Sequence, residues 1–232
     1  MRIAPLLLAF VLCPLLWSQE GNQLEADRWF VGELNGQPAV SLHEVCTRKG
    51  DGGRTSAVSM AMVIKRTLGK SDPASRFEVR DTQVFEEDAS GDIVSFKFDH
   101  EEGGTRTSAT GRVTRTSSAP VDGGDGVTRE VVATVYRLGR KTEVRLPIPA
   151  GAVLVGDRRS QEMLAKIERA VGEQARFTSV GLLNNRVILI VSTATFAGHD
   201  ERGQLLYDVV SDAMPIPMRL RLTPKGELAG MT

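Results

Sequence analysis

Two segments of the chain constrain its fold most strongly, because each has the pattern of a β-hairpin with a two-residue turn. The segments are VGELNGQPAV at 31–40 and VGLLNNRVIL at 180–189. In each, an Asn-Gly or Asn-Asn pair interrupts a run of apolar residues, and such pairs tolerate the positive φ that a tight hairpin turn requires. We therefore predict an antiparallel hairpin at both places.

The first turn fixes an expected register for its two strands. Counting outward from it places Val31 opposite Val40 and Trp29 opposite Leu42, so that four apolar side chains share one face. Pro38 then occupies a position whose missing N–H points away from the partner strand. The side beyond Pro38 is predicted to be a sheet edge or an interruption.

Counting outward from the second turn gives an equivalent strand register. Val180 faces Leu189, and Leu182 faces Val187, which again forms an apolar face. Two readings of the likeness between the hairpins remain open. It is either a structural pseudo-repeat or a coincidence of two short matches.

Alternation with a period of two continues through much of the chain, as in the segment 58–65, where Val and Met alternate with Ser and Ala. Further strands are predicted at 76–85, 93–99, 112–116, 127–138, 142–146, 177–180, 187–196, 205–210 and 218–222. The segment SSAPVDGGDG at 117–126 has the composition of a solvated loop. A further turn is predicted at 223–226.

One amphipathic helix interrupts the strands. Ser160 is a plausible N-cap, and Gly172 suits the left-handed position just past a helix end. Between them an apolar stripe recurs at helical spacing, formed by Met163, Leu164, Ile167, Ala170 and Val171. The opposite side, with Glu162, Lys166, Glu168 and Arg169, is expected to face water. The fold class predicted from this pattern is mainly β, with a large twisted antiparallel sheet or half-barrel and one amphipathic helix.

The first residues have the layout of a secretory leader: one Arg, an apolar run from Ile3 to Trp17, and then a polar stretch. We expect a signal peptide at 1–18, a polar spacer at 19–27 and a single β-rich domain at 28–232. Two similar lobes, 28–150 and 151–232, are an alternative division of that domain. The expected location is periplasmic or extracellular, and an uncleaved membrane anchor is the disfavoured alternative.

Composition narrows the set of partners. Lys+Arg and Asp+Glu both number 29, so the formal net charge is zero. Nucleic acids and anionic membranes attract proteins with a basic excess, which makes them unfavoured as main partners, although a local basic patch remains open. After removal of the leader, Cys46 is the sole cysteine, so the exported chain must be held by packing without an internal disulfide.

Several residue groups resemble fragments of reactive sites. His43, Glu44 and Cys46 are close in sequence, but in a strand His43 and Cys46 point to opposite faces. Nothing in the sequence near Cys46 would lower the pKa of its thiol, so we expect a buried apolar role for it. The three histidines His43, His100 and His199 lack the spacing of metal ligands on one element.

Other motif fragments are incomplete. LGKS at 68–71 lacks the upstream glycine and the following helix of a phosphate-binding loop. DASGD at 88–92 and DGGDG at 122–126 lack the full oxygen ligand series of a calcium loop and are read as turns. The acid pairs Glu86-Glu87 and Glu101-Glu102 are expected to form a solvated rim. No catalytic, cofactor-binding or metal-binding residue is therefore assigned, and no cofactor is expected.

Larger stretches resemble a known group of proteins. RWFVGELNGQPAVSLHEV at 28–45, the alternating strand that leads to RTLGK, and FEVRDTQVFEEDASGDIVSFKFDHEEGGTRTSATGRV at 77–113 are similar to the region before the catalytic domain of exported bacterial transglutaminase-like proteins. MRLRLTPKGELAG at 218–230 is similar to the end of that region. The resemblance implies a non-catalytic β-rich module. Cys46 does not match the nucleophile of that family, which opens a helix, so no catalytic residue carries over.

A second, weaker similarity is to periplasmic lipoprotein-carrier half-barrels, which curve an antiparallel sheet around a helix and an apolar hollow. Two functions are expected from these readings. The first is an exported, non-catalytic binding or scaffold module of the cell envelope. The alternative is a lipid or lipoprotein carrier whose sheet and helix enclose an apolar cavity, with Met60, Met62 and Met163 as adaptable lining. An enzyme with a dispersed site is the least favoured class, and the partner is unknown, with an envelope protein or a lipid as candidates.

Overall fold

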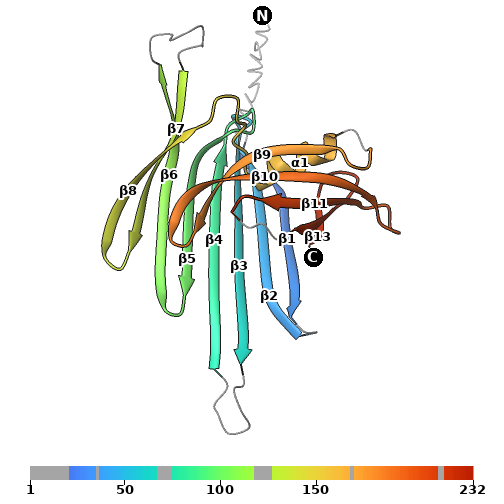
Figure 1. Ribbon diagram of the computed structural model, residues 1–232, viewed down its shortest axis with the longest axis horizontal. Coiled ribbons are helices and arrows are strands. Elements are labelled where there is room, and N and C mark those ends of the chain that lie inside the picture. Colours follow the sequence, from blue (N-terminus) through green and yellow to red (C-terminus); the bar gives the residue numbers. More distant parts are fainter. Residues whose placement is uncertain are drawn as a thin grey trace, which may run out of the picture.

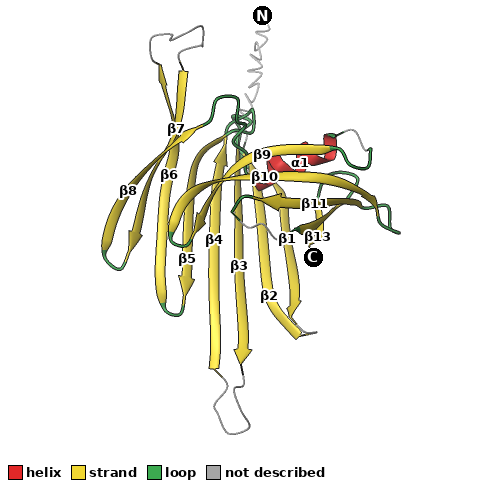
Figure 2. Ribbon diagram, in the orientation of Figure 1, coloured by secondary structure: helices red, strands yellow, loops and turns green. Residues whose placement is uncertain are grey.

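The computed structural model describes residues 21–34, 37–66, 75–117, 127–167, 170–213 and 217–231. Over these residues the chain forms two antiparallel sheets and one short helix (Figure 1 and Figure 2). The predicted fold class, mainly β with a large antiparallel sheet and one helix, is confirmed. Among the described residues no helix is both long and apolar enough to cross a membrane.

The larger sheet is a simple meander in which each of eight strands pairs with the next along the chain. Its strands are β1 (Gln23–Leu34), β2 (Gln37–Arg48), β3 (Arg54–Arg66), β4 (Ser75–Glu87), β5 (Ile93–Glu102), β6 (Thr105–Ser117), β7 (Val127–Arg137) and β8 (Arg140–Ile148).

The smaller sheet has five strands in the order β13-β12-β11-β10-β9. These are β9 (Gln174–Leu183), β10 (Arg186–His199), β11 (Leu205–Ser211), β12 (Met218–Leu222) and β13 (Leu228–Met231), and the helix α1 (Asp157–Lys166) precedes them. Figure 1 shows β9, β10 and β11 running crosswise to the long strands of the larger sheet.

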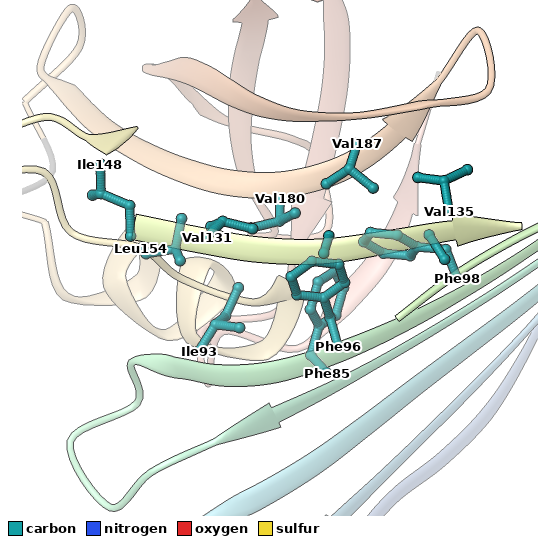
Figure 3. Close-up of a cluster of buried hydrophobic side chains, with 12 residues drawn as sticks. Phe85, Ile93, Phe96, Phe98, Val131, Val135, Ile148, Leu154, Val180 and Val187 are labelled. Atoms are coloured by element: carbon teal, nitrogen blue, oxygen red, sulfur yellow. The ribbon is translucent and has the colours of Figure 1, made fainter. Parts of the chain in front are cut away.

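The main core lies where the β9–β10 hairpin meets the inner face of the larger sheet. Phe85, Phe96 and Phe98 from β4 and β5 are at most 4% exposed, and they belong to one buried cluster with Val180 and Val187 of the hairpin. Figure 3 shows the two valines facing the phenylalanines across the gap between the sheets. The Phe96 and Phe98 rings stack at 5.0 Å between centroids, and Phe85 meets Phe98 edge-on at 5.6 Å.

Gly111 on β6 makes room for the central ring of this cluster. It pairs with Phe96 across the two strands. A Cβ atom built at Gly111 would lie 2.2 Å from Cζ of Phe96, well inside van der Waals contact. The absence of a side chain at this position therefore lets the Phe96 ring lie flat over β6.

We predict that Gly111→Ala destabilises the protein by about 2 kcal/mol, because the new methyl group overpacks the core and displaces Phe96. Urea unfolding followed by far-UV circular dichroism would measure the change. The double variant Gly111→Ala/Phe96→Leu should recover part of the loss. The control Thr110→Ala, at an exposed neighbour on the same strand, should be close to neutral. A Gly111→Ala protein as stable as the parent would contradict this account.

The first hairpin corrects the expected register. Close to the turn, Glu33 pairs with Pro38 as predicted, but Ala39 is then skipped and Gly32 pairs with Val40. Such a β-bulge shifts the partners from Gly32 back to Ala26 by one residue, so Trp29 pairs with His43 and not with Leu42. Trp29 is consequently 68% exposed on the outer face, contrary to the predicted apolar face. The turn itself, 35–36, lies outside the described residues.

Val31 was predicted to face Val40, but it pairs with Ser41 and is 70% exposed. The residue that faces Leu42 is Phe30. The second hairpin, in contrast, has the predicted register: Val180 pairs with Leu189 and Leu182 with Val187. Its turn residues Asn184 and Asn185 have φ of 49° and 61°.

The helix also departs from its predicted limits. It begins three residues before Ser160, with Gly156 as N-cap, and it ends at Lys166, where Ile167 turns to an extended conformation. Val171 therefore lies outside the helix and is 75% exposed. Gly172 has φ of 95° but donates its N–H to Phe196, in a turn that follows the helix.

Several other expectations differ in extent. Strand β6 begins at Thr105, seven residues before the predicted strand at 112–116, and β13 was not predicted at all. Segments 68–71 and 122–126 lie outside the described residues, as do the leader at 1–18 and the positions 168–169. The division into two lobes stays a prediction.

Candidate functional site

Two adjoining hollows lie between the inner face of the larger sheet and the smaller sheet. Their volumes are about 230 and about 400 Å³. Six residues line both hollows, which makes them parts of one cavity: Leu42, Val58, Ser179, Ser192, Val209 and Met218. The space falls in the range of small-molecule binding sites.

The walls of the cavity are mainly apolar because the period of the strands places alternate residues on the inner face. Leu42 comes from β2, and Val58 and Met60 come from β3. Phe177 and Leu220 close the opposite side from the smaller sheet. Of the methionines expected in a pocket, Met60 lines it, while Met163 packs at the helix core and Met62 is half-buried.

The smaller hollow has a polar end formed by Glu44 and Gln161. Glu44 is only 3% exposed, and its carboxylate is 3.3 Å from the guanidinium of Arg28. Gln161 on α1 is 7% exposed, and its Oε1 has no hydrogen-bond partner among the described residues. Buried carbonyl groups are almost always satisfied, so this oxygen is available to a donor inside the cavity.

Sequence reasoning named Glu44 but missed Gln161 and Arg28. A usable signal for Glu44 was its place on the same strand face as the apolar residues Leu42 and Cys46. Gln161 could not be found because the helix was expected to begin beside it. With the helix starting at Asp157, Gln161 lies within the helix, on the side that faces the sheets.

Ion pairs fix the helix that carries Gln161 to the larger sheet. Arg54 on β3 lies 3.1 Å from Glu162 on α1 and 2.9 Å from Glu25 on β1. Arg158 also contacts Glu162 at 3.5 Å. Glu162, expected to face water, is instead partly buried in this network. The network holds one wall of the cavity in place.

The pKa of Glu25 is set by this network. Burial alone would raise it, but the hydrogen bond from Arg48 and the charge of Arg54 lower it below its ordinary value of 4.5. A carboxylate with a lowered pKa in the folded protein contributes stability above its unfolded pKa. That contribution is lost as the pH falls through the folded pKa.

We predict that Glu25→Gln lowers stability at about pH 7 and that its difference from the parent shrinks as the pH falls below 4.5 toward about pH 3. Urea unfolding at a series of pH values would measure both free energies. The matched control is Glu201→Gln, at an exposed carboxylate for which no ion pair is found among the described residues. Its difference from the parent should stay near zero. A Glu25→Gln difference that does not change with pH would refute this role.

Cys46 lies next to the network and is fully buried. Burial and the negative charge of Glu25 raise the pKa of its thiol, although a hydrogen bond from Ser56 opposes the shift. The thiol is therefore protonated at neutral pH and is a poor nucleophile. This agrees with the expectation of a buried structural cysteine.

The three histidines have separate environments. The His43 ring stacks on Trp29 at 4.0 Å on the outer face, away from Cys46. His100 Nδ1 is 2.7 Å from Asp81, and the pKa of His100 is raised because this carboxylate outweighs the effect of burial. His199 meets Phe196 edge-on at the end of β10. No cluster able to hold a metal ion is found among the described residues.

The acidic motifs behave in part as expected. Asp88 Oδ1 accepts hydrogen bonds from the amides of Ser90 and Asp92 at 2.9 and 3.1 Å, so it closes a turn. Burial opposes ionisation of Asp88, but the hydrogen bonds from the Ser90 hydroxyl and from the two amides lower its pKa. Glu87 corrects the prediction of a solvated rim, because it is only 2% exposed. A Cβ atom on Gly156 would lie 2.2 Å from its Oε1, so glycine at the helix N-cap accommodates it.

Comparison with known proteins places the chain by its fold. No family model matches the sequence, and no curated protein matches it. Among solved structures, the chain is similar to a beta-barrel-like protein of the domain of unknown function DUF1849 from Brucella abortus. The two share 13% identity with a TM-score of 0.50, over 91% of this chain and 89% of the other. This likeness concerns the arrangement of strands.

Proposed function

We propose that this chain is an exported, non-catalytic binding module of the cell envelope that holds one apolar chain between its two sheets. This combines the binding-module and carrier expectations from the sequence. The observation that carries the proposal is the cavity with apolar walls, which lies beside a closed, well-packed core. A carrier needs such a space because an acyl chain gains about 0.8 kcal/mol for each methylene group removed from water.

The polar end of the cavity indicates what the ligand carries at its head. Both Glu44 and the free oxygen of Gln161 are acceptors, and Glu44 is already neutralised by Arg28. A second carboxylate placed here would lie next to the Glu44 carboxylate and the unpartnered Gln161 oxygen. Of these two side chains only the Gln161 amide N–H groups are donors, so the loss of its hydration would be poorly compensated. We therefore favour an amphiphile whose head is a hydroxyl, amide or ammonium group over a free fatty acid.

Catalysis by this cavity has no support from its lining. A hydrolytic site needs a nucleophile within hydrogen-bond reach of a base. Cys46 is protonated and lies outside the cavity lining, and no histidine belongs to the lining, although His100 pairs with the lining carboxylate Asp81 at 2.7 Å. A purified protein that turned over a peptide, ester or glycan, and lost this on Cys46→Ala, would overturn the proposal.

We predict that filling the cavity abolishes binding of an apolar probe. The parent should enhance the fluorescence of N-phenyl-1-naphthylamine, and long-chain alcohols should displace the probe. Ser192→Phe places a ring where both hollows meet and should weaken probe binding by about tenfold or more. Native mass spectrometry of protein taken from the envelope should find a co-purifying lipid.

The matched control is Ser59→Phe, which adds the same ring at an exposed position of β3. It should bind the probe as the parent does. A second filling variant, Val58→Trp, covers the case in which Ser192→Phe fails to fold. Equal binding by the parent and by both filling variants would refute the cavity as the site, and so would an absence of binding by the parent.

A separate prediction tests the polar end. Gln161→Met keeps the size of the side chain but removes the unpartnered buried oxygen, so the ligand-free protein should become more stable by about 1 kcal/mol. Binding of dodecanol should weaken, whereas binding of methyl laurate, which has no donor, should not change. Thermal unfolding and probe displacement measure the two effects. A variant that binds both ligands like the parent would exclude Gln161 from head-group recognition.

A further inference from the structure

A second hollow lies at the far end of the larger sheet and shares no lining residue with the cavity above. It has a volume of about 740 Å³ and is formed between the β7–β8 turn and the β9–β10 turn. Figure 1 shows these two turns as neighbouring loops at the same end of the molecule. Its lining residues are Val135, Arg137, Leu138, Arg140, Thr142, Val144, Asn184, Asn185 and Arg186.

Three arginines face this hollow without an acidic neighbour. Arg137, Arg140 and Arg186 make no ion pair among the described residues, and no acidic side chain belongs to the lining. The alternation of side chains along each strand explains why the arginines and the acidic residues lie on opposite faces. Lys141 and Glu143 lie on the opposite face of β8, where they pair with each other at 3.7 Å.

The arrangement of the arginines is unfavourable for the isolated protein. Arg137 and Arg140 are direct cross-strand partners on either side of the turn, and like charges at such positions repel. Arg186, from the facing hairpin, adds a third positive charge. An anion bound between them would remove this repulsion and receive charge-assisted hydrogen bonds from the planar guanidinium groups.

The turn between the arginines has a second unfavourable feature. Leu138 has φ of 49° and is 72% exposed. Asparagine, aspartate or glycine are the residues that such a turn prefers, since a leucine in the left-handed region is strained. An exposed, strained leucine between two repelling arginines lowers the stability of the folded protein. Such unfavourable features concentrate at functional sites.

The opposite wall of the hollow is held firmly. Asn185 at the tip of the β9–β10 turn accepts a hydrogen bond from the fully buried hydroxyl of Thr107 at 2.6 Å. Val135 and Val144, which also belong to or pack on the main core, form an apolar floor. The hollow therefore has one fixed wall and a fixed apolar floor, which are properties of a preformed binding site, and its arginines are exposed to an incoming anion.

We propose that this hollow binds a phosphate-bearing amphiphile, with the phosphate between Arg137, Arg140 and Arg186 and the apolar part against Leu138. A phosphate monoester supplies three terminal acceptor oxygens for three guanidinium groups, whereas a carboxylate supplies two. The proposal is independent of the cavity between the sheets. The three arginines form a local basic patch, which is compatible with a formal net charge of zero for the whole chain.

The test uses the full mature protein and three probes. Inorganic phosphate and hexyl phosphate are measured by isothermal titration calorimetry. Cosedimentation is measured with vesicles of phosphatidylcholine, alone or with about one phosphatidic acid, a lipid with a phosphate monoester, in five lipids. The expected result is binding to hexyl phosphate and to the phosphatidic acid vesicles, with little binding to phosphatidylcholine alone. Binding to hexyl phosphate alone would assign the site to a free organic phosphate, and binding to the vesicles as well would assign it to a lipid headgroup.

Variants separate the site from general electrostatics. Arg140→Gln and Arg186→Gln should each weaken hexyl phosphate binding by about tenfold or more. The matched control Arg145→Gln removes an exposed arginine from the outer face of the same strand, where it pairs with Glu130 at 2.8 Å, and should leave binding unchanged. The proposal is overturned if no phosphate probe binds, if hexanoate binds as tightly as hexyl phosphate, or if the two arginine variants bind like the control.

Leu138→Asn tests the apolar half of the proposal. The variant should be more stable than the parent because asparagine accepts the left-handed conformation, a gain that a purely structural role for Leu138 would not predict. It should retain binding of inorganic phosphate and lose affinity for hexyl phosphate. Unchanged affinity for both would show that Leu138 does not contact the ligand.

Discussion

The structure depends on the burial of one hairpin, β9–β10, against the phenylalanine-rich inner face of the larger sheet. Eight strands in a meander present a broad apolar face, and no local contact within the meander can cover it. Val180 and Val187 cover the part formed by β4 to β7, where Phe96 lies over Gly111 and the packing is closed. Without this contact neither the cavity nor the arrangement of the two turns beside the arginines would exist.

The cavity arises because the smaller sheet packs less closely on the larger sheet over β2 and β3. There the smaller sheet presents Ser179 and Ser192 in place of large apolar side chains, and these do not fill the space above Leu42 and Val58. Helix α1 covers the remaining side and is held by the ion pairs of Arg54. A dense core and an unfilled chamber thus adjoin each other between the same two sheets.

Charge is distributed by strand alternation in both proposed sites. At the cavity, the inward carboxylate Glu44 is matched by Arg28, so the interior is close to neutral and suits an apolar ligand. At the far hollow, the arginines face inward and the acids of the same hairpin face outward. A formal net charge of zero for the whole chain therefore conceals a local excess of positive charge.

The sequence was sufficient for most of the strands and for the second hairpin, because alternation and the Asn184-Asn185 turn are local signals. The prediction from sequence failed where one extra residue shifts the pairing of the strands in the first hairpin. The skipped Ala39 moves Trp29 to the outer face, and no periodic pattern announces such a bulge. Strand β6 was underestimated because its Thr, Ser and Gly residues lack apolar alternation. The two sites could not be predicted, since Gln161 and Arg186 are brought to them only by the packing of elements that are distant in sequence.

The larger sheet that forms one wall of the cavity is open, not closed into a barrel. In the described part of the chain its strands run from β1 at one margin to β8 at the other, and these margins are not bonded to each other. A closed cylinder of strands could widen only by breaking backbone hydrogen bonds. An open sheet can change its curvature with all its strand pairings intact, so we expect the proposed binding cavity to adjust its width to its ligand.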